Sequence, residues 1–321
     1  NNVSIITGVS PACHGISGNF FLERGSLNAT MMTDPSLLRA ETILAAFSRH
    51  GAKVAVVTAK DKLRRLLAYG INGTCISAEQ ECVPIYSATL SEHVFKRALA
   101  LLRSDRPDLM YLSTSDYVQH LHRPGSREAN EFYRMIDSHL SEFHVNDVTL
   151  VITADHGMNS KTNAAGEPCV VFLQTLLDDW FGKHSSTVIL PITDPYVAHH
   201  GSLGSFACIY LWNRELITQL ISRLSEVKGI ELVLDGDAAA TQLELPADRI
   251  GDVVVCADRQ SVLGTRREDH DLSQLTHPLR SHGGLVEREV PMLFNRPLPT
   301  DAAAESLHNY DAFWIGLNLI Q

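Results

Sequence analysis

The segment 149–159, TLVITADHGMN, joins an apolar run to a group of polar residues and indicates how the chain folds. The run 150–152 is typical of a strand buried on both faces of a parallel sheet. Asp155 and His156 follow at the carboxyl end of this expected strand, where ligands bind in open α/β sheets. A turn is the alternative, because Asp caps helices and Gly157 is a residue type frequent in turns.

Strand-like segments alternate with helical patterns over the first half of the chain, which is typical of βαβ units. The expected strands are 52–59, 108–114 and 148–154, and polar residues follow each of them. These residues are Lys60 and Lys62 after the first strand, Asp116 and His120 after the second, and Asp155 and His156 after the third. The three groups are expected to converge at one edge of the sheet. The sequence therefore predicts an α/β fold with a mainly parallel sheet and flanking helices.

The second half of the chain predicts a different arrangement. The segment 205–236 has the pattern strand, helix, strand, and 250–258 adds a further strand. The segment 280–294, RSHGGLVEREVPMLF, returns to the pattern of a strand edge. We therefore expect a small inserted α+β cap at 171–267, between two parts of the core at 1–170 and 268–321.

Composition restricts the classes of partner. A net charge of −10 without a basic stripe argues against nucleic acid, and the interrupted apolar runs predict no transmembrane helix. The six cysteines are scattered and form no C-x-x-C pair, which favours free thiols in a reducing compartment. We expect a cytoplasmic protein with a small-molecule substrate, with no membrane partner, and with a homodimer as one candidate assembly.

Two spacings indicate a metal centre. Asp116 and His120 are four residues apart, so on a helical turn both side chains lie on one face. His282 is followed by two glycines, which allow close approach of the backbone. Histidine and carboxylate together are suitable zinc ligands. With Asp155 and His156, five residues of ligand type stand at strand edges, and this combination is more specific than any one of its motifs.

The chain resembles the alkaline phosphatase superfamily, in the branch that contains nucleotide pyrophosphatases/phosphodiesterases and phosphonoacetate hydrolases. The segments NNVSIITGVSPACHGISGN, STSDYVQHLHRPG, TADHGM and RSHGG carry the resemblance, which spans nearly the whole chain. It implies an alkaline phosphatase-like core and two zinc ions. Asp116, His120 and His282 would hold one ion, and Asp155 and His156 would hold the other, together with an early Asp and a nucleophilic Thr.

The resemblance places that threonine before Asn1, outside this sequence. Thr7 and Ser4 are poor replacements, because both fall inside the expected first helix and family nucleophiles stand at its N-terminus. Asn19 matches an asparagine whose amide donates to a phosphoryl oxygen, and a turn asparagine is the alternative. The span 72–83 is short for the family, which suggests that a loop is absent there. No role is assigned to His199 or His200.

Lys60 and Lys62 bear on the substrate. If the segment is extended, two residues of separation place both side chains on one side. In phosphonoacetate hydrolases two such lysines hold the substrate carboxylate, so the resemblance implies hydrolysis of the C–P bond of phosphonoacetate to acetate and phosphate. A solvated basic helix start is the alternative for the lysines. A phosphodiesterase, a nucleotide pyrophosphatase or a phosphomonoesterase of the same superfamily, or a non-catalytic metal-binding homologue, remain alternatives for the function.

Overall fold

The computed structural model describes residues 1–25, 28–192, 198–299 and 307–320. The chain divides into two compact units. The first comprises Asn1–Val9, Thr33–Asp155 and Val290–Gln321, and the second comprises Ser10–Met32 and His156–Glu289. The predicted cap, 171–267, lies within the second unit together with its flanking segments. The predicted domain boundaries stay a prediction. The boundaries between the two compact units fall at other residues.

The first unit is built on a three-stranded parallel sheet with the order β4-β3-β5. These strands are β3 (Val54–Thr58), β4 (Thr74–Ser77) and β5 (Leu109–Ser113). The strands predicted at 52–59 and 108–114 are thereby confirmed. All five residues of β3 are buried, as expected for a strand covered on both faces.

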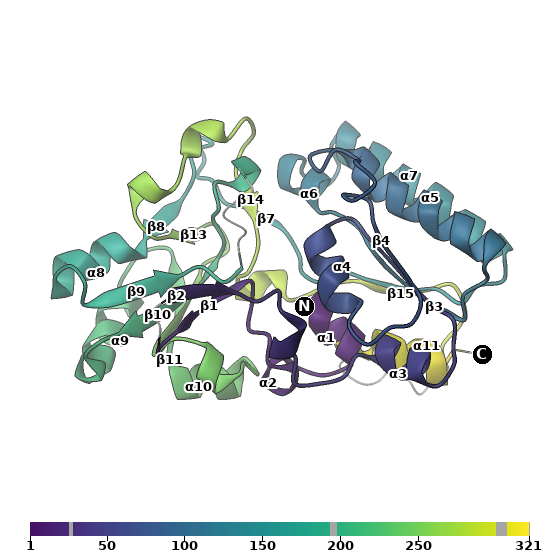
Figure 1. Ribbon diagram of the computed structural model, residues 1–321. Coiled ribbons are helices and arrows are strands. Elements are labelled where there is room, and N and C mark those ends of the chain that lie inside the picture. The colour runs from purple at the N-terminus through teal and green to yellow at the C-terminus, as the bar shows by residue number, and fades with distance from the viewer. Residues whose placement is uncertain (26–27, 193–197, 300–306, 321) are drawn as a thin grey trace. The chain divides into compact units, whose positions relative to one another are not determined.

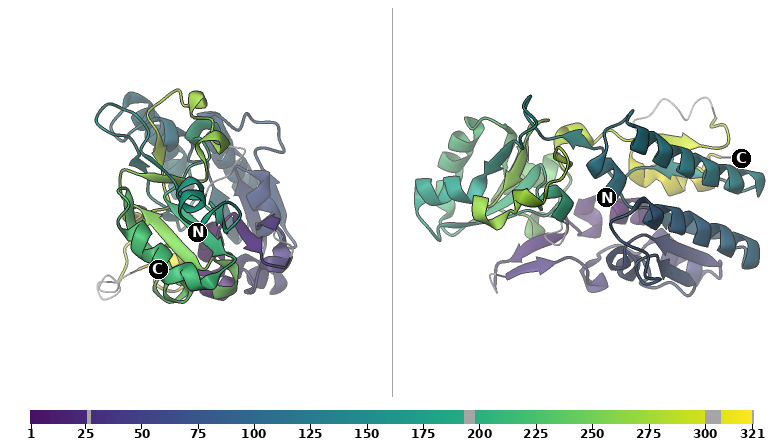
Figure 2. Two further views of the ribbon diagram at one scale, coloured as in Figure 1. Left: turned by 90° about the vertical axis from the view of Figure 1, so that its left-hand side faces the viewer. Right: turned by 90° about the horizontal axis from the view of Figure 1, so that it is seen from above.

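Helices cover both faces of this sheet. On one face, α5 (Ala88–Ser104) and α7 (Arg127–Val145) run side by side in both Figure 1 and Figure 2 and pack over Val57. The opposite face carries α1 (Asn2–Thr7), α3 (Ile43–Arg49), α4 (Asp61–Leu67) and α11 (Ala312–Asn318). Val54 and Val56 pack among these helices, so alternate residues of β3 serve opposite cores.

The strand that precedes Asp155 differs from the expectation. β6 (Val151–Thr153) is half-buried and pairs antiparallel with β15 (Met292–Phe294). A strand is present within 148–154, but the prediction that it is buried on both faces is wrong. Its pairing with β15 is antiparallel, whereas a parallel sheet was predicted. The chain returns to this unit at Val290, and the returning segment supplies a partner that runs in the opposite direction.

The second unit contains a four-stranded antiparallel sheet with the order β11-β12-β10-β9. Its strands are β9 (Ser186–Ile189), β10 (Phe206–Leu211), β11 (Ile230–Asp235) and β12 (Val253–Ala257). One face packs against α8 (Leu173–Phe181) and α9 (Ile217–Ser225), and the other against α10 (Gly236–Gln242). The strand-helix-strand pattern predicted at 205–236 is confirmed by β10, α9 and β11.

Shorter elements complete the two units. They are α2 (Pro11–His14), β1 (Phe20–Glu23), β2 (Asn28–Met31), α6 (Tyr117–Leu121), β7 (Asn159–Ser160), β8 (Val170–Phe172), β13 (Val262–Gly264) and β14 (Arg280–Ser281). The 3-10 helices are η1 (Pro35–Leu37), η2 (Ala198–His200), η3 (Arg214–Leu216), η4 (Ala247–Arg249), η5 (Arg267–Asp269), η6 (Leu272–Gln274), η7 (Leu285–Glu287) and η9 (Asn309–Asp311). Among the described residues, no helix is both long and apolar enough to cross a membrane.

His14 is a structural residue at the end of α2. Its side chain is buried, and its Nδ1 accepts a hydrogen bond of 3.1 Å from the backbone N–H of Ile16. Burial lowers the pKa of His14 from 6.5 to about 3, so the imidazole stays neutral and can accept this bond. This bond gives His14 a structural role in the turn that follows α2.

The neutral state of His14 predicts a pH dependence of folding stability. Between pH 6.5 and about 3 the unfolded chain binds a proton at His14 that the folded chain does not bind. Stability is therefore lost as the pH falls, by about 2 kcal/mol between pH 7 and pH 5. Urea unfolding at both values measures this loss. His14→Gln keeps an acceptor but does not titrate, so its loss over this interval should be smaller by a similar amount. An equal loss in both proteins would contradict the prediction.

Candidate functional site

Asp116 and His120 form a pair on α6 in the first unit. Asp116 is the N-cap residue of this helix, but its side chain makes no capping hydrogen bond. Its Oδ2 instead lies 3.1 Å from Nε2 of His120, whose exposed fraction is only 4%. The prediction that both side chains share one face is confirmed. A carboxylate and a buried imidazole that converge in this way are suited to grip one cation.

Asp155 lies two residues after the end of β6 and is held by a series of hydrogen bonds within the first unit. The Nδ2 of Asn2, in the first turn of α1, donates to Oδ2 of Asp155 at 2.8 Å. The Oδ1 of Asn2 accepts from the Tyr111 hydroxyl at 2.7 Å and from Ser113 Oγ at 3.2 Å. Burial, together with the charge of Asp155, raises the pKa of Tyr111, so this hydroxyl remains a donor. These hydrogen bonds through Asn2 fix the orientation of the Asp155 carboxylate.

His156 and His282 come together within the second unit. Ser160 pairs with Arg280 and Asn159 with Ser281 in the short antiparallel ladder of β7 and β14. This ladder brings together two segments far apart in the sequence. The two imidazole rings stack with centroids 3.5 Å apart and planes 6° apart. Sequence analysis predicted both histidines as ligands but did not predict this ladder.

The glycines beside these histidines permit tight packing against η7. A Cβ on Gly157 would lie 3.3 Å from Cα of Glu287, and a Cβ on Gly284 would lie 2.8 Å from its Oε2. Gly283 has a φ of +102°, a conformation that residues with side chains rarely adopt. The close approach at Gly157 is thus made to the protein's own backbone.

The residues present fit a metal centre. The donor set consists of carboxylates and imidazoles, which zinc prefers together with thiolates. The 3.1 Å contact brings the Asp116 carboxylate and the His120 imidazole together, and the Asn2 amide orients Asp155 as partners outside a ligand shell do. Asp116, His120 and Asp155 belong to the first unit, whereas His156 and His282 belong to the second. The predicted division of these five residues between two ions stays a prediction.

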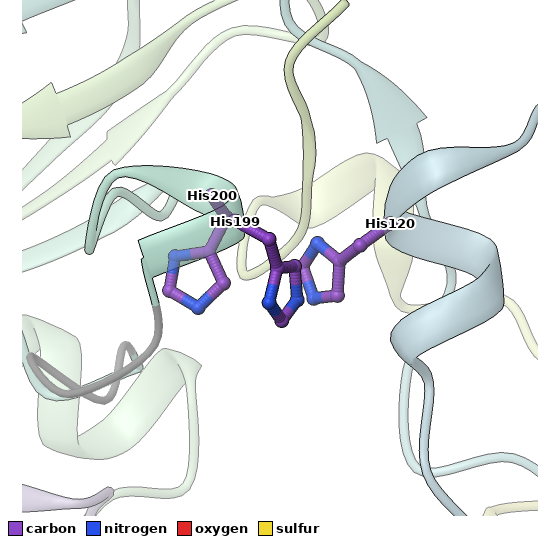
Figure 3. Close-up of side chains that lie close together, drawn as sticks. All are labelled: His120, His199 and His200. Carbon is purple, nitrogen blue, oxygen red and sulfur yellow. The ribbon is translucent and has the colours of Figure 1, made fainter. Parts of the chain in front are cut away.

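Two further histidines lie on η2 in the second unit. His199 and His200 have rings 5.1 Å apart in a T-shaped arrangement. Figure 3 draws both rings on η2, and draws His120 on α6. Sequence analysis assigned His199 and His200 no role, because adjacent histidines without a recognised motif carry no specific signal.

Lys60 and Lys62 do not lie in one extended segment. Lys60 is the N-cap residue of α4, with φ of −105° and ψ of 138°, and Lys62 lies inside the first turn of that helix. The prediction that two residues of extended chain align the two lysines is therefore wrong, because the helix begins between them. Their predicted role in substrate binding is not tested by this difference and stays a prediction.

The other basic residues of α4 are neutralised locally. Asp61 accepts from Nε of Arg64 and from Nε of Arg65, at 2.6 Å each. Burial alone would raise the pKa of Asp61, but these arginines and a hydrogen bond from Ser77 outweigh burial and lower it. Asp61 therefore stays ionised and pairs with the two arginines.

Asn19 stands just before β1 in the second unit. The side-chain Nδ2 of Asn19 donates to the backbone carbonyl of Ile192 at 3.0 Å. The backbone carbonyl of Asn19 accepts from the N–H of Met32 at 2.8 Å. These bonds anchor the side chain and the backbone. Because an amide nitrogen carries two hydrogens, the bond to Ile192 is compatible with the predicted donation to a phosphoryl oxygen.

Comparison with known proteins shows the family to which the chain belongs. The family model of type I phosphodiesterase / nucleotide pyrophosphatase matches residues 1–285. The chain therefore belongs to the type I phosphodiesterase / nucleotide pyrophosphatase family.

Within the family, the chain is similar to solved phosphonoacetate hydrolases. The enzyme from Sinorhizobium meliloti 1021, solved in complex with phosphonoformate, is 47% identical, with a TM-score of 0.93 over 98% of this chain and 82% of that chain. The same enzyme in complex with phosphonoacetate gives the same identity and TM-score and is covered over 83% of its length. The phosphonoacetate hydrolase of Penicillium oxalicum is 54% identical over 41 residues, which are 12% of this chain and 57% of that protein.

More distant structures share the fold. Murine ectonucleotide pyrophosphatase / phosphodiesterase 5 has a TM-score of 0.67 at 16% identity, over 98% of this chain and 81% of that chain. The predicted α/β, alkaline phosphatase-like fold class is thereby confirmed. The resemblance inferred from the sequence motifs is confirmed as well.

Proposed function

We propose that the chain hydrolyses the C–P bond of phosphonoacetate to acetate and phosphate, with two zinc ions as cofactors. The likeness to the S. meliloti enzyme, at 47% identity over 98% of this chain, carries the proposal. In the balanced reaction, water supplies the oxygen that phosphorus gains and the proton that the carbon of the leaving acetate gains. The P–C bond breaks and a P–O bond forms.

The proposal assigns Asp116, His120 and His282 to one zinc ion, and Asp155 and His156 to the other. The 3.1 Å Asp116–His120 contact supports a common ion for these two residues, and the stacked rings of His156 and His282 support the presence of both imidazoles at one centre. When bound, zinc supplies positive charge that stabilises the phosphonyl oxygens and lowers the pKa of water.

The remaining roles fall to the polar groups of the chain. Asn19 donates a hydrogen bond to a phosphonyl oxygen, and Lys60 and Lys62 bind the substrate carboxylate. The nucleophile implied by the resemblance is a threonine before Asn1. Lysine ammonium groups suit the far end of the substrate, because the metal ions hold only its phosphorus end.

The same proposal includes a small phosphonate as partner, a cytoplasmic location and a homodimeric assembly. The reducing compartment is supported by the cysteines, all six of which are free thiols.

A phosphodiesterase activity is the second candidate, because the family model is that of type I phosphodiesterases. Phosphate release from phosphonoacetate, measured beside cleavage of a nitrophenyl phosphodiester by the intact protein, discriminates between the two. We expect turnover of phosphonoacetate to exceed that of the diester. The reverse order would establish the phosphodiesterase, and zinc binding without turnover of either substrate would indicate a non-catalytic homologue.

A further inference from the structure

A buried ion pair lies beneath the two histidine-bearing segments of the second unit. The Nζ of Lys161 is 3.0 Å from Oε1 of Glu287, and the two side chains are 0% and 1% exposed. Lys161 also donates to the carbonyl oxygen of Arg259 at 3.1 Å. Burial lowers the pKa of Lys161, and the charge of Glu287 opposes that shift. A pair of this kind needs further hydrogen bonds to repay its desolvation, and replacement by apolar residues is often neutral or stabilising.

Glu287 makes those further bonds to both segments. Its Oε1 accepts from Nδ2 of Asn159 at 2.7 Å, and its Oε2 accepts from the N–H of Gly284 at 2.7 Å. Its backbone carbonyl accepts from the N–H of Gly157, also at 2.7 Å. One residue therefore holds the backbone directly after His156 and the glycines directly after His282.

The stacking of the two rings depends on how these segments are held. The β7–β14 ladder pairs only two residues on each strand, so it fixes the segments weakly by itself. The Glu287 bonds add contacts to both segments, at Gly157 and Asn159 after His156 and at Gly284 after His282. The His156 and His282 rings of these two segments stack 3.5 Å apart.

We propose that Lys161 and Glu287 are positioning residues that set the spacing of His156 and His282 for metal binding. The proposal rests on the proposed function in one respect, because it takes the two histidines as metal ligands. Lys161 orients the carboxylate of Glu287 through the 3.0 Å contact, and Glu287 holds the two segments. Partners outside the ligand shell typically change metal affinity by about 10- to 100-fold when they are removed.

The first test uses Glu287→Gln. A glutamine offers one acceptor oxygen where the carboxylate offers two. Either the N–H of Gly284 or the two donors Asn159 and Lys161 therefore lose their acceptor. Zinc affinity of the folded protein is measured by competition with a chromophoric chelator. We expect at least a tenfold weaker affinity. Because a lone buried Lys161 charge could unfold the protein, the double variant K161M/E287Q, which removes both charges, is measured in parallel and is expected to show the same loss.

A matched control separates positioning from general destabilisation. Leu220 on α9 is fully buried in a core cluster of the same unit that includes neither histidine, so Leu220→Ala opens a cavity away from the histidines. We expect this variant to lose stability against urea and yet to bind zinc like the wild type. Equal loss of affinity in Leu220→Ala and Glu287→Gln would assign the ion pair a purely structural role, and wild-type affinity in both Glu287 variants would overturn the proposal.

A second readout needs no metal. Stacked imidazoles shift each other's carbon-bound proton resonances, so the NMR signals of His156 and His282 report their spacing in the metal-free protein. We expect these signals to move in Glu287→Gln and K161M/E287Q but not in Leu220→Ala. A wild-type chain that binds no zinc would contradict the metal centre, whereas unmoved signals in the Glu287 variants would contradict the positioning role.

Discussion

Asp116→Asn is expected to remove one of two zinc ions from the protein and to abolish most hydrolysis of phosphonoacetate. Asparagine preserves the size of the side chain but replaces an anionic ligand with a neutral one. The Oδ2 that lies 3.1 Å from Nε2 of His120 is the atom whose charge is lost. A metal ion contributes several kcal/mol to stabilising a developing charge, so we expect turnover to fall by at least about a hundredfold.

Zinc content by mass spectrometry of metals and phosphate release by the intact protein measure the two effects. The control is Asp137→Asn, which neutralises an exposed carboxylate on α7 in the same unit. It should leave zinc content and turnover unchanged. If Asp116→Asn retains both ions, Asp116 is not a ligand, and the 3.1 Å contact serves only to orient His120.

The features that sequence analysis predicted correctly depend on local pattern. Four of the five residues of β3 are apolar, so neighbouring residues alone indicate this strand. The Asp116–His120 pair was predictable for the same reason, because a helix brings residues four apart together. These predictions needed no knowledge of the tertiary structure.

The features that were missed depend on residues far apart in the sequence. Lys161 and Glu287 are 126 positions apart. Lysine and glutamate are residue types that usually lie at the surface, so neither residue by itself indicates a buried pair. Asn2, which orients Asp155, acts across 153 positions. The helix that starts between Lys60 and Lys62 was predicted only as the alternative, although Asp61 is a residue type favoured in a first helical turn.

The substrate assignment depends most directly on Lys60 and Lys62. Metal ions recognise the phosphorus end of any substrate in this superfamily, so a group that binds the far end must distinguish phosphonoacetate from a phosphate ester. Both lysines belong to the first turn of α4 or its cap, and Asp61 is occupied by Arg64 and Arg65. We assign Lys60 and Lys62 to the substrate carboxylate on the resemblance to phosphonoacetate hydrolases, and the following variants test this assignment.

Lys60→Ala and Lys62→Ala are each expected to lower turnover of phosphonoacetate by at least tenfold. A charge-assisted hydrogen bond contributes about 1.5–3 kcal/mol, which corresponds to roughly one to two powers of ten. Cleavage of nitrophenyl phosphate, which has no carboxylate, should change little. Lys96→Ala, on the exposed face of α5, is the matched control and should affect neither substrate. Equal losses on both substrates would assign the lysines to phosphate binding or folding. Unchanged turnover of phosphonoacetate would make them a solvated basic helix start, and the carboxylate would then be recognised by other residues, because the metal ligands alone cannot distinguish it from an ester.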